Sequence, residues 1–207
     1  MFITFEGIEG SGKSTQRELV LHWLKSEGHD VIETREPGGT DFGVHLRKIL
    51  LSKDSRITTN RSELFLFAAD RTEHIHQVIE PALSTGRWVV CDRYIDSTFA
   101  YQYGGRRHPK EDILDIIRLT RAVEPDLTIF LDVSVKEGLS RAASRGALDR
   151  FEQETIDFHD RVRTAYLECY ELNQHRVVKI DAENRTPNEI FLDIKSAINS
   201  RRAVAHD

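Results

Sequence analysis

The sequence predicts an α/β protein in which about five parallel strands form one sheet and helices cover both of its faces. Short apolar runs alternate with longer helical patterns along the chain, which is the order that a parallel sheet requires. The 207 residues, of which 39% are hydrophobic and 30% charged, suffice for a substantial core. Because no repeat, low-complexity segment or linker divides the chain, we expect a single domain over residues 1–207.

The first strand and the turn after it carry the most specific motif. Phe2–Phe5 is a short apolar run, and Gly7–Ser14 satisfies the phosphate-binding pattern G-x-x-x-x-G-K-[ST]. Glycines allow close approach of the backbone to an anion, and the helix that begins near Lys13 adds free N–H groups. A surface turn without a ligand is the alternative. The motif predicts a P-loop NTPase fold in which ATP is bound by Gly7, Glu9, Gly10, Ser11, Gly12, Lys13, Ser14 and Thr15.

The second strand places an arginine at the edge of the sheet. The first helix ends at Gly28, and Val31–Thr34 is predicted as a strand before a Pro-Gly-Gly turn. Arg35 therefore follows the carboxyl end of this strand, where open α/β sheets bind ligands. A surface arginine without a role is the alternative. The sequence leaves open whether Pro37 is cis.

Two helical patterns follow, over Asp41–Leu51 and Ser62–Leu83. Within the second, Phe67 and Arg71 are four residues apart and share one face of the helix. Packing in the core would explain Phe67 but not an arginine beside it. Both residues are therefore candidates for a ligand site.

The third strand, Trp88–Asp92, is a continuous apolar run that ends in a carboxylate, as expected of a central parallel strand. An aspartate at this edge is suited to Mg²⁺ or its waters, and the P-loop hydroxyl of Ser14 is the other expected ligand. A simple ion pair between Asp92 and Arg93 is the alternative.

The segment Tyr94–Pro109 is polar and contains glycine, which makes it a candidate for recognition of base and sugar. Its Tyr103, Arg106 and Arg107 fit no pattern that would assign them a role. An amphipathic helix over Glu111–Val123 and a buried strand over Leu127–Asp132 follow it.

A helix from about Val135 leads into a basic segment around residues 144–152. Arg141, Arg145 and Arg150 lie around a glycine between two helical patterns, which predicts a flap, or LID, that carries positive charge to a phosphoryl group. A solvated basic loop is the alternative.

The last third of the chain continues the alternation. We expect a helix over Gln153–Asn173, a strand over Val177–Asp181 and a final helix that ends near Asn199. The final helix opens with a capping box, Thr186-Pro187-Asn188-Glu189, that has proline at its first position. The tail Arg201–Asp207 is expected to fray.

Composition argues against several other classes of protein. No apolar run approaches the roughly 20 residues of a membrane span, and the first residues form a strand rather than a signal peptide, so we expect a cytoplasmic protein. The net charge of −5 argues against general binding of nucleic acid. Nine histidines, His74 and His76 among them, lack metal-ligand spacing and are expected at the surface. Cys91 and Cys169 are interpreted as reduced packing residues rather than a disulfide.

Several motifs together resemble those of the bacterial type of thymidylate kinase. They are Phe5–Thr15, Thr34–Thr40, Leu66–Arg71, Asp92–Tyr94 with Ser97–Thr98 and Ala100–Gln102, and Ser144–Gly146 with Asp149–Glu152. The resemblance implies the reaction ATP + dTMP ⇌ ADP + dTDP with Mg²⁺, in dTTP biosynthesis, by a homodimer. A kinase for another deoxynucleoside monophosphate, such as dUMP or dCMP, and a non-catalytic ATP-binding module are the alternatives.

The resemblance also implies a role for each matched residue of the acceptor site. These residues are Arg35 and Arg93 at the dTMP phosphate, Glu9 at the 3′-hydroxyl and near the metal, Tyr101 against C2′, Phe67 stacked on thymine, Arg71 at O4, Thr98 at N3, and Gln102 in the same substrate site.

Members of this family place a catalytic basic residue either inside the P-loop or in the flap. This P-loop carries no basic residue before its lysine, so the resemblance implies the flap route. The expected catalytic residues are Lys13, Arg93, Arg145 and Arg150, with Arg141 near the adenine. Because phosphoryl transfer leaves little covalent work to the protein, no side-chain nucleophile is expected.

Overall fold

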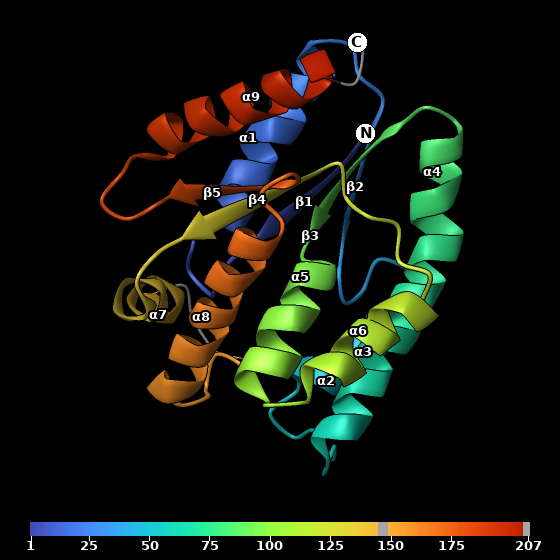
Figure 1. The fold of residues 1–207 in the computed structure, drawn as a ribbon, viewed down its shortest axis with the longest axis vertical. Coiled ribbons are helices and arrows are strands. Elements are labelled where there is room, and N and C mark those ends of the chain that lie inside the picture. The colour runs from blue at the N-terminus through green and yellow to red at the C-terminus, as the bar shows by residue number, and fades with distance from the viewer. Residues whose placement is uncertain (145–148, 205–207) are drawn as a thin grey trace.

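The computed structural model describes residues 1–144 and 149–204. Five parallel strands form one sheet in the order β2-β3-β1-β4-β5, which confirms the predicted fold class (Figure 1). The strands are β1 (Phe2–Glu6), β2 (Val31–Arg35), β3 (Trp88–Asp92), β4 (Leu127–Asp132) and β5 (Val177–Asp181). Strand β1, which leads into the P-loop, lies at the centre of the sheet between β3 and β4.

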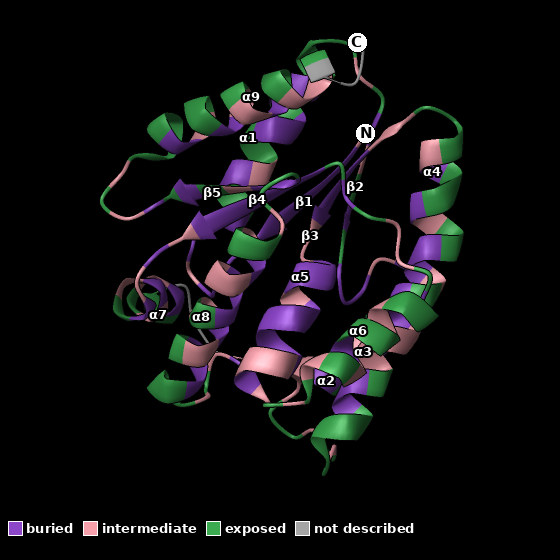
Figure 2. Ribbon diagram, viewed as in Figure 1, coloured by how far each residue is buried: buried purple, intermediate pink, exposed green. Residues whose placement is uncertain are grey.

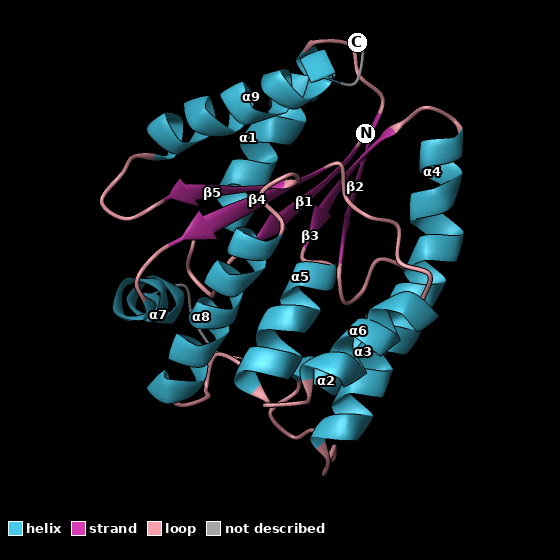
Figure 3. Ribbon diagram, viewed as in Figure 1, coloured by secondary structure: helices cyan, strands magenta, loops and turns pink. Residues whose placement is uncertain are grey.

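Helical elements connect the strands (Figure 3). They are α1 (Lys13–Ser26), α2 (Asp41–Leu51), α3 (Asn60–His74), η1 (Ile75–Ile79), α4 (Glu80–Ser84), α5 (Ile95–Thr98), η2 (Phe99–Gly105), α6 (Lys110–Leu119), α7 (Val135–Ser144), α8 (Ile156–Leu172) and α9 (Pro187–Val204), where η marks a π-helical turn.

The core consists of the sheet and the apolar faces of the helices on either side of it. Helices α1 and α9 pack together over one face, and α8 and α4 lie over the other (Figure 1). On the second face, Phe2 and Val89 pack against η1 and α4, while Phe130 stacks on Tyr166 of α8 at 5.3 Å. The inner strands are buried along their length, as expected of a parallel sheet covered on both sides (Figure 2).

The structure changes several helix boundaries. The pattern over 62–83 begins earlier, at Asn60, because Thr59 caps the helix by accepting the N–H of Ser62, and a π-helical turn interrupts it at η1. The polar segment after β3 is largely helical, since α5 and η2 occupy it. Helix α8 begins at Ile156 rather than at residue 153, because Thr155 caps it and accepts the N–H of Phe158.

The C-terminal capping box is confirmed, with the backbone N–H of Thr186 donating to Glu189 at 2.8 Å. Fraying from Arg201 is wrong for residues 201–204, which continue α9, and the last three residues lie outside the described part of the chain. Arg201 donates to the carbonyl of His175, and Arg202 pairs with Glu27 at 3.1 Å, so both side chains anchor this end of the helix.

Burial of polar groups corrects one expectation and confirms another. His74 and His159 are fully buried, so the surface location expected for the histidines is wrong for these two. Cys91 and Cys169 are buried free thiols, as predicted. Within residues 1–144 and 149–204, no helix combines the length and apolar character needed to cross a bilayer.

Candidate active site

A cleft of about 670 Å³ opens at the carboxyl ends of β1, β2 and β3. The P-loop, the turn after β2, α3, the α5–η2 segment and α7 line it. This is the edge of the sheet where the fold class predicts ligand binding. The cleft brings together most of the site residues expected from the sequence.

The P-loop adopts the backbone that its glycines permit. Gly7, Gly10 and Gly12 have φ values of 139°, 70° and 97°, which residues with a side chain rarely adopt. Ser14 and Thr15 are exposed and line the cleft, so the Ser14 hydroxyl is available to a ligand. The loop therefore has the glycine-dependent backbone that close approach of a polyphosphate requires.

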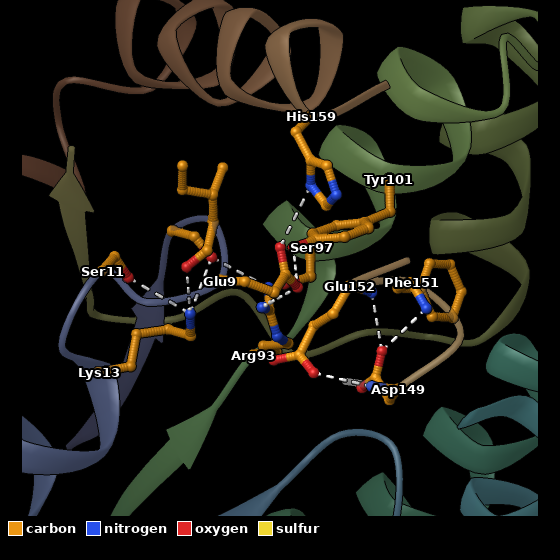
Figure 4. Close-up of polar contacts among 12 residues, drawn as sticks. Glu9, Ser11, Lys13, Arg93, Ser97, Tyr101, Asp149, Phe151, Glu152 and His159 are labelled. Carbon is orange, nitrogen blue, oxygen red and sulfur yellow. Dashed lines mark hydrogen bonds and ion pairs between the residues drawn. The ribbon is translucent and has the colours of Figure 1, made fainter. Parts of the chain in front are cut away.

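The lysine of the P-loop lies folded into the loop. Lys13 Nζ donates to the carbonyls of Gly7 at 2.9 Å and Ile8 at 2.8 Å, and to Ser11 Oγ at 3.3 Å (Figure 4). Burial, followed by repulsion from Arg93, lowers the pKa of Lys13 from 10.5 to about 8. If a phosphate bound here, Lys13 could donate to its charged oxygens in place of these neutral acceptors.

Only one of the two carboxylate oxygens of Asp92, at the end of β3, has a partner among the described residues. Its Oδ2 forms an ion pair with Arg17 Nη1 of α1 at 2.8 Å, and its Oδ1 is buried without a hydrogen-bond partner among the described residues. The alternative of an ion pair with Arg93 is wrong, because the guanidinium of Arg93 turns to Glu9 instead. Sequence reasoning missed Arg17, which is brought to Asp92 only by the packing of α1 on the sheet.

The donor chemistry here fits Mg²⁺. The unpartnered Oδ1 of Asp92 and the exposed hydroxyl of Ser14 are hard oxygen donors, and both residues line the cleft. Among the described residues, no group of three or more His, Cys, Asp or Glu side chains gathers to hold a metal. A cation at this place would therefore take its other ligands from phosphate oxygens and water.

The half-buried Arg93 forms a cluster with the buried Glu9 of the P-loop and the buried Tyr101 (Figure 4). Arg93 Nη2 donates to Glu9 Oε1 at 2.9 Å, the Tyr101 hydroxyl donates to the same oxygen at 2.5 Å, and the guanidinium lies 4.9 Å from the centre of the Tyr101 ring. Although burial acts to raise it, Arg93 and then Lys13 hold the pKa of Glu9 below its ordinary value. Glu9 is therefore a charged acceptor next to the P-loop.

A second carboxylate supports this cluster. Glu6, at the end of β1, accepts the N–H of Tyr94 at 2.7 Å, Ser97 Oγ at 2.5 Å and the Tyr166 hydroxyl at 2.9 Å. The same Tyr166 hydroxyl accepts Arg93 Nη1 at 3.1 Å. Burial, followed by repulsion from Asp96, raises the pKa of Glu6 to about 7. No role was predicted for this carboxylate, although a glutamate that ends an apolar strand was a visible signal.

The four residues expected around the base lie in the same cleft. Phe67, Arg71, Thr98 and Gln102 all line the cleft, and of these only Phe67 is more than marginally exposed. Arg71 donates through Nε to Glu36 Oε2 at 2.8 Å, and its Nη2 lies 2.7 Å from the same oxygen as an ion pair. Its Nη1 is buried and has no hydrogen-bond partner among the described residues, so the guanidinium keeps an unused donor.

The structure separates the two arginines expected at the acceptor phosphate. Arg93 lines the cleft, whereas Arg35 is exposed at the end of β2 and does not line it. Arg47 of α2 lines the cleft instead, with Nη1 donating to the carbonyl of Pro37 at 2.8 Å. Burial, and then Arg35, lower the pKa of Arg47. Sequence reasoning missed Arg47, since only the turn that contains the cis Glu36–Pro37 peptide bond brings α2 back to the site.

The flap arginines also differ in placement. Arg141 of α7 lines the cleft, and its Nε donates to Glu137 at 2.6 Å. Arg150 does not line it, because Nε donates to the carbonyl of Leu50 at 2.8 Å and Nη2 pairs with the buried Glu63 at 2.7 Å. Arg145 lies outside the described residues.

The buried carboxylate of Glu63 also binds Arg106, a residue for which the sequence predicted no role. Arg106 donates to Glu63 at 3.0 Å and to Glu154 at 2.5 Å, so it ties η2 to α3 and to the segment before α8. Arg106 does not line the cleft itself but joins elements that surround it. Gln102, which lines the cleft, shares the same Glu63 oxygen at 3.4 Å.

Comparisons with known proteins agree on one family. The profile described as thymidylate kinase matches residues 5–202. A thymidylate kinase of Maridesulfovibrio salexigens is 45% identical over 97% of this chain and 96% of its own, and one of Nostoc punctiforme is 47% identical over 86% of each chain. The crystal structure of thymidylate kinase from Ehrlichia chaffeensis superposes with a TM-score of 0.79 at 34% identity, over 96% of this chain and 98% of that one.

Proposed function

The chain belongs to the thymidylate kinase family and phosphorylates dTMP to dTDP with ATP as donor, and we propose that the cleft described above is where this transfer takes place. One observation carries the proposal. The P-loop and a second polar pocket belong to one continuous cleft, and the second pocket is lined by the side chains of Arg47, Arg71 and Arg93. Two nucleotides bound there would meet between Lys13 and Arg93, both of which line it.

On the donor side, we propose that the P-loop residues from Gly7 to Thr15 bind the phosphates of ATP and that Arg141 covers the adenine. Lys13 would leave the loop carbonyls for the β- and γ-phosphates. Ser14 and Asp92, with Glu9 nearby, would hold Mg²⁺ or its waters. When bound, Mg²⁺ would neutralise charge on the phosphate oxygens of ATP, which favours attack on the γ-phosphorus and departure of ADP.

On the acceptor side, Phe67 would stack on thymine while the guanidinium of Arg71 donates to O4. Thr98 would face N3, and Gln102 closes the same wall of the pocket. Arg93, with Arg35 at the rim, would hold the phosphate. Arg47 lies where it can share this work, because it lines the cleft beside the turn after β2.

The sugar would lie between the two halves of the cleft. Glu9 would accept the 3′-hydroxyl, since its carboxylate is already charged and ordered by Arg93 and Tyr101. The ring of Tyr101 would crowd C2′ and so disfavour a ribose.

We propose the flap arginines as the groups that stabilise charge on the transferring phosphoryl group, together with Lys13 and Arg93. Arg145 is assigned by its match to the family's flap motif. Arg150 would have to exchange Glu63 for the phosphoryl group to take part, so its role depends on movement of the flap.

The enzyme is further proposed to be a cytoplasmic homodimer. ATP and the free deoxynucleotides that it uses are cytoplasmic metabolites. An exposed apolar surface on α2 and α3 supports the dimer, because large side chains of this kind are normally covered in an assembly.

The experiment is to measure ADP formation from ATP and Mg²⁺ with dTMP, dUMP, dCMP, dGMP or ribothymidine monophosphate as the acceptor, each against a control without acceptor. We expect dTMP to have the highest kcat/KM. The variants Arg93→Ala and Arg47→Ala should raise the KM for dTMP while ATP binding persists. If every acceptor matches the control although ATP binds, the cleft does not carry out the transfer. A lead for dCMP or dUMP would reassign the base pocket.

A further inference from the structure

A chain of four buried side chains runs behind the base pocket, from β2 to α3. Thr34 Oγ1 lies 2.6 Å from His74 Nε2, and His74 Nδ1 lies 2.9 Å from Glu36 Oε1. Glu36 Oε2 then accepts Nε of Arg71 at 2.8 Å and pairs with its Nη2 at 2.7 Å. Each of the four side chains is at most 8% exposed. Thr34 and Glu36 belong to one sequence motif, Arg71 ends another and His74 lies beyond both, so only the fold joins the four.

The hydrogen bonds fix how each group is used. A carboxylate only accepts, so His74 must donate from Nδ1 to Glu36, while its Nε2 shares a hydrogen bond with the Thr34 hydroxyl. The two oxygens of Glu36 are thereby divided between His74 and Arg71. With Oε1 held by His74, the carboxylate presents only Oε2 to the guanidinium.

The imidazole has little freedom to leave this position. It is fully buried, and a Cβ built on Gly39 would lie 2.4 Å from His74 Cδ2, so the backbone of the turn packs directly on the ring. The N–H of Glu36 is bonded to the carbonyl of Asp92 at 2.9 Å, which fixes the other partner. Arg71 is also held by Tyr94, because its guanidinium packs on the Tyr94 ring at 5.0 Å from the ring centre.

These contacts use two of the three nitrogens of Arg71 and leave Nη1 without a partner among the described residues. Arg71 lines the cleft, and a guanidinium only donates, so the edge that it turns to a bound base offers donors and no acceptor. A donor at this edge matches a carbonyl oxygen and opposes an amino group.

We propose that His74 is a positioning residue that acts through Glu36 on Arg71 and so sets the preference for an acceptor base with a carbonyl group, as in thymine, over one with an amino group, as in cytosine. The inference rests on the proposed contact of Arg71 with the base. His74 touches neither substrate nor the reacting phosphoryl group. Its effect should therefore fall on KM and on acceptor preference rather than on the chemical step.

Two substitutions of His74 separate this role from simple packing. In His74→Asn, the amide can replace Nδ1 as donor to Glu36, whereas in His74→Gln it replaces Nε2 and leaves Glu36 Oε1 without its donor. The readouts are kcat and KM for dTMP and for dCMP, with thermal unfolding to check folding. His76→Gln, an exposed histidine two residues on, is the matched control.

We expect His74→Gln to raise the KM for dTMP by about tenfold or more, as loss of a hydrogen bond to a charged group predicts, and to narrow the preference for dTMP over dCMP, with little change in kcat. His74→Asn should stay within about threefold of the wild type, given that one donor replaces another. A KM in His74→Gln equal to that of the wild type would overturn the proposal, as would equal losses in the Asn and Gln variants.

A cycle with Arg71→Ala distinguishes failure of this inference from failure of the proposed function. If Arg71→Ala leaves the KM for dTMP unchanged, the proposed contact with the base is wrong and the inference fails with it. If Arg71→Ala raises KM, then adding His74→Gln to it should cost nothing further, and a full additional loss would overturn the inference alone. Should His74→Gln fail to fold, Thr34→Val releases Nε2 with little change of shape. A rise in KM that disappears in the Arg71→Ala background supports the proposal, and an unchanged KM overturns it.

Discussion

Lys13 illustrates how a single residue is prepared for a ligand. Without a phosphate, its ammonium group is satisfied by two loop carbonyls and a hydroxyl, none of which carries charge. Burial and the nearby guanidinium of Arg93 lower its pKa to about 8. Polyphosphate would add several negative charges at the same place, which favours the protonated form.

We therefore predict that ATP binding takes up protons near pH 8. With a pKa of about 8, Lys13 is about half neutral there, and the bound triphosphate should restore roughly half a proton. Calorimetric titrations in two buffers with different ionisation enthalpies measure this uptake. At pH 6.5, where Lys13 is already charged, its contribution should vanish. Lys13→Arg is the matched control, because a guanidinium keeps its proton throughout. Equal uptake by wild type and Lys13→Arg at pH 8 would contradict the assignment.

Tyr101 combines two functions that can be separated. Its hydroxyl donates to Glu9, while its ring lies under Arg93 and lines the cleft. Tyr101→Phe should keep rejection of ribothymidine monophosphate, because the ring remains, but should raise the KM for dTMP through a less ordered Glu9. Tyr101→Ala should lose the discrimination between dTMP and the ribonucleotide by about tenfold or more. The ratio of kcat/KM values for the two acceptors measures this, and a ratio unaffected by Tyr101→Ala would show that the ring does not exclude the ribose.

At the scale of elements, the P-loop depends on its contact with α7. A Cβ built on Gly10 would lie 2.0 Å from the carbonyl oxygen of Gly138, and one built on Gly138 would lie 2.5 Å from the carbonyl oxygen of Glu9. Both distances are too short for any real contact, and the opposing atoms are backbone. Two glycines, one in the P-loop and one in α7, are thus needed where the loop and the helix cross.

Gly138→Ala should separate the P-loop from α7. Alanine is intrinsically better in a helix than glycine by about 1 kcal/mol, but the displaced backbone should cost about 1 to 3 kcal/mol and weaken ATP binding as well. Denaturant unfolding and ATP titration measure the two effects. Ser140→Ala, at an exposed position of the same helix, controls for helix propensity. A Gly138→Ala variant that is more stable and binds ATP normally would mean that the crossing is not tight.

The elements show what local pattern could and could not predict. All five strands and the P-loop were predicted, because hydrophobic runs and glycine spacing are properties of neighbouring residues. Helix starts were missed where a threonine cap decides them, as Thr59 and Thr155 do. The fixed start of α8 also shows why 153–155 does not belong to it.

Residues of the candidate site were predictable where they belong to a recognisable motif, whereas contacts between side chains of different elements were not. Arg17, Arg47 and His74 reach the site region from α1, α2 and α3, and their partners lie in other elements. Nothing local distinguishes such residues from surface arginines or histidines. Arg150 was expected over the cleft, yet a buried carboxylate holds it on α3, a contact between residues 87 positions apart. Its catalytic role stays a prediction.

At the scale of the whole molecule, the outer surface of α2 and α3 carries Phe42, Ile49 and Phe65, which are 47%, 47% and 54% exposed. The first two are seven residues apart and form one exposed stripe of the helix, which runs beside the buried Leu46 and Leu50. If this surface joins two copies of the chain, Phe65→Glu should shift the protein from dimer to monomer by placing a charge in the interface. Sedimentation velocity over a concentration series measures the shift. Leu172→Glu, on α8 and 59% exposed, is the control and should remain dimeric. A monomeric wild type, or a Phe65→Glu dimer as tight as the wild type, would exclude this surface.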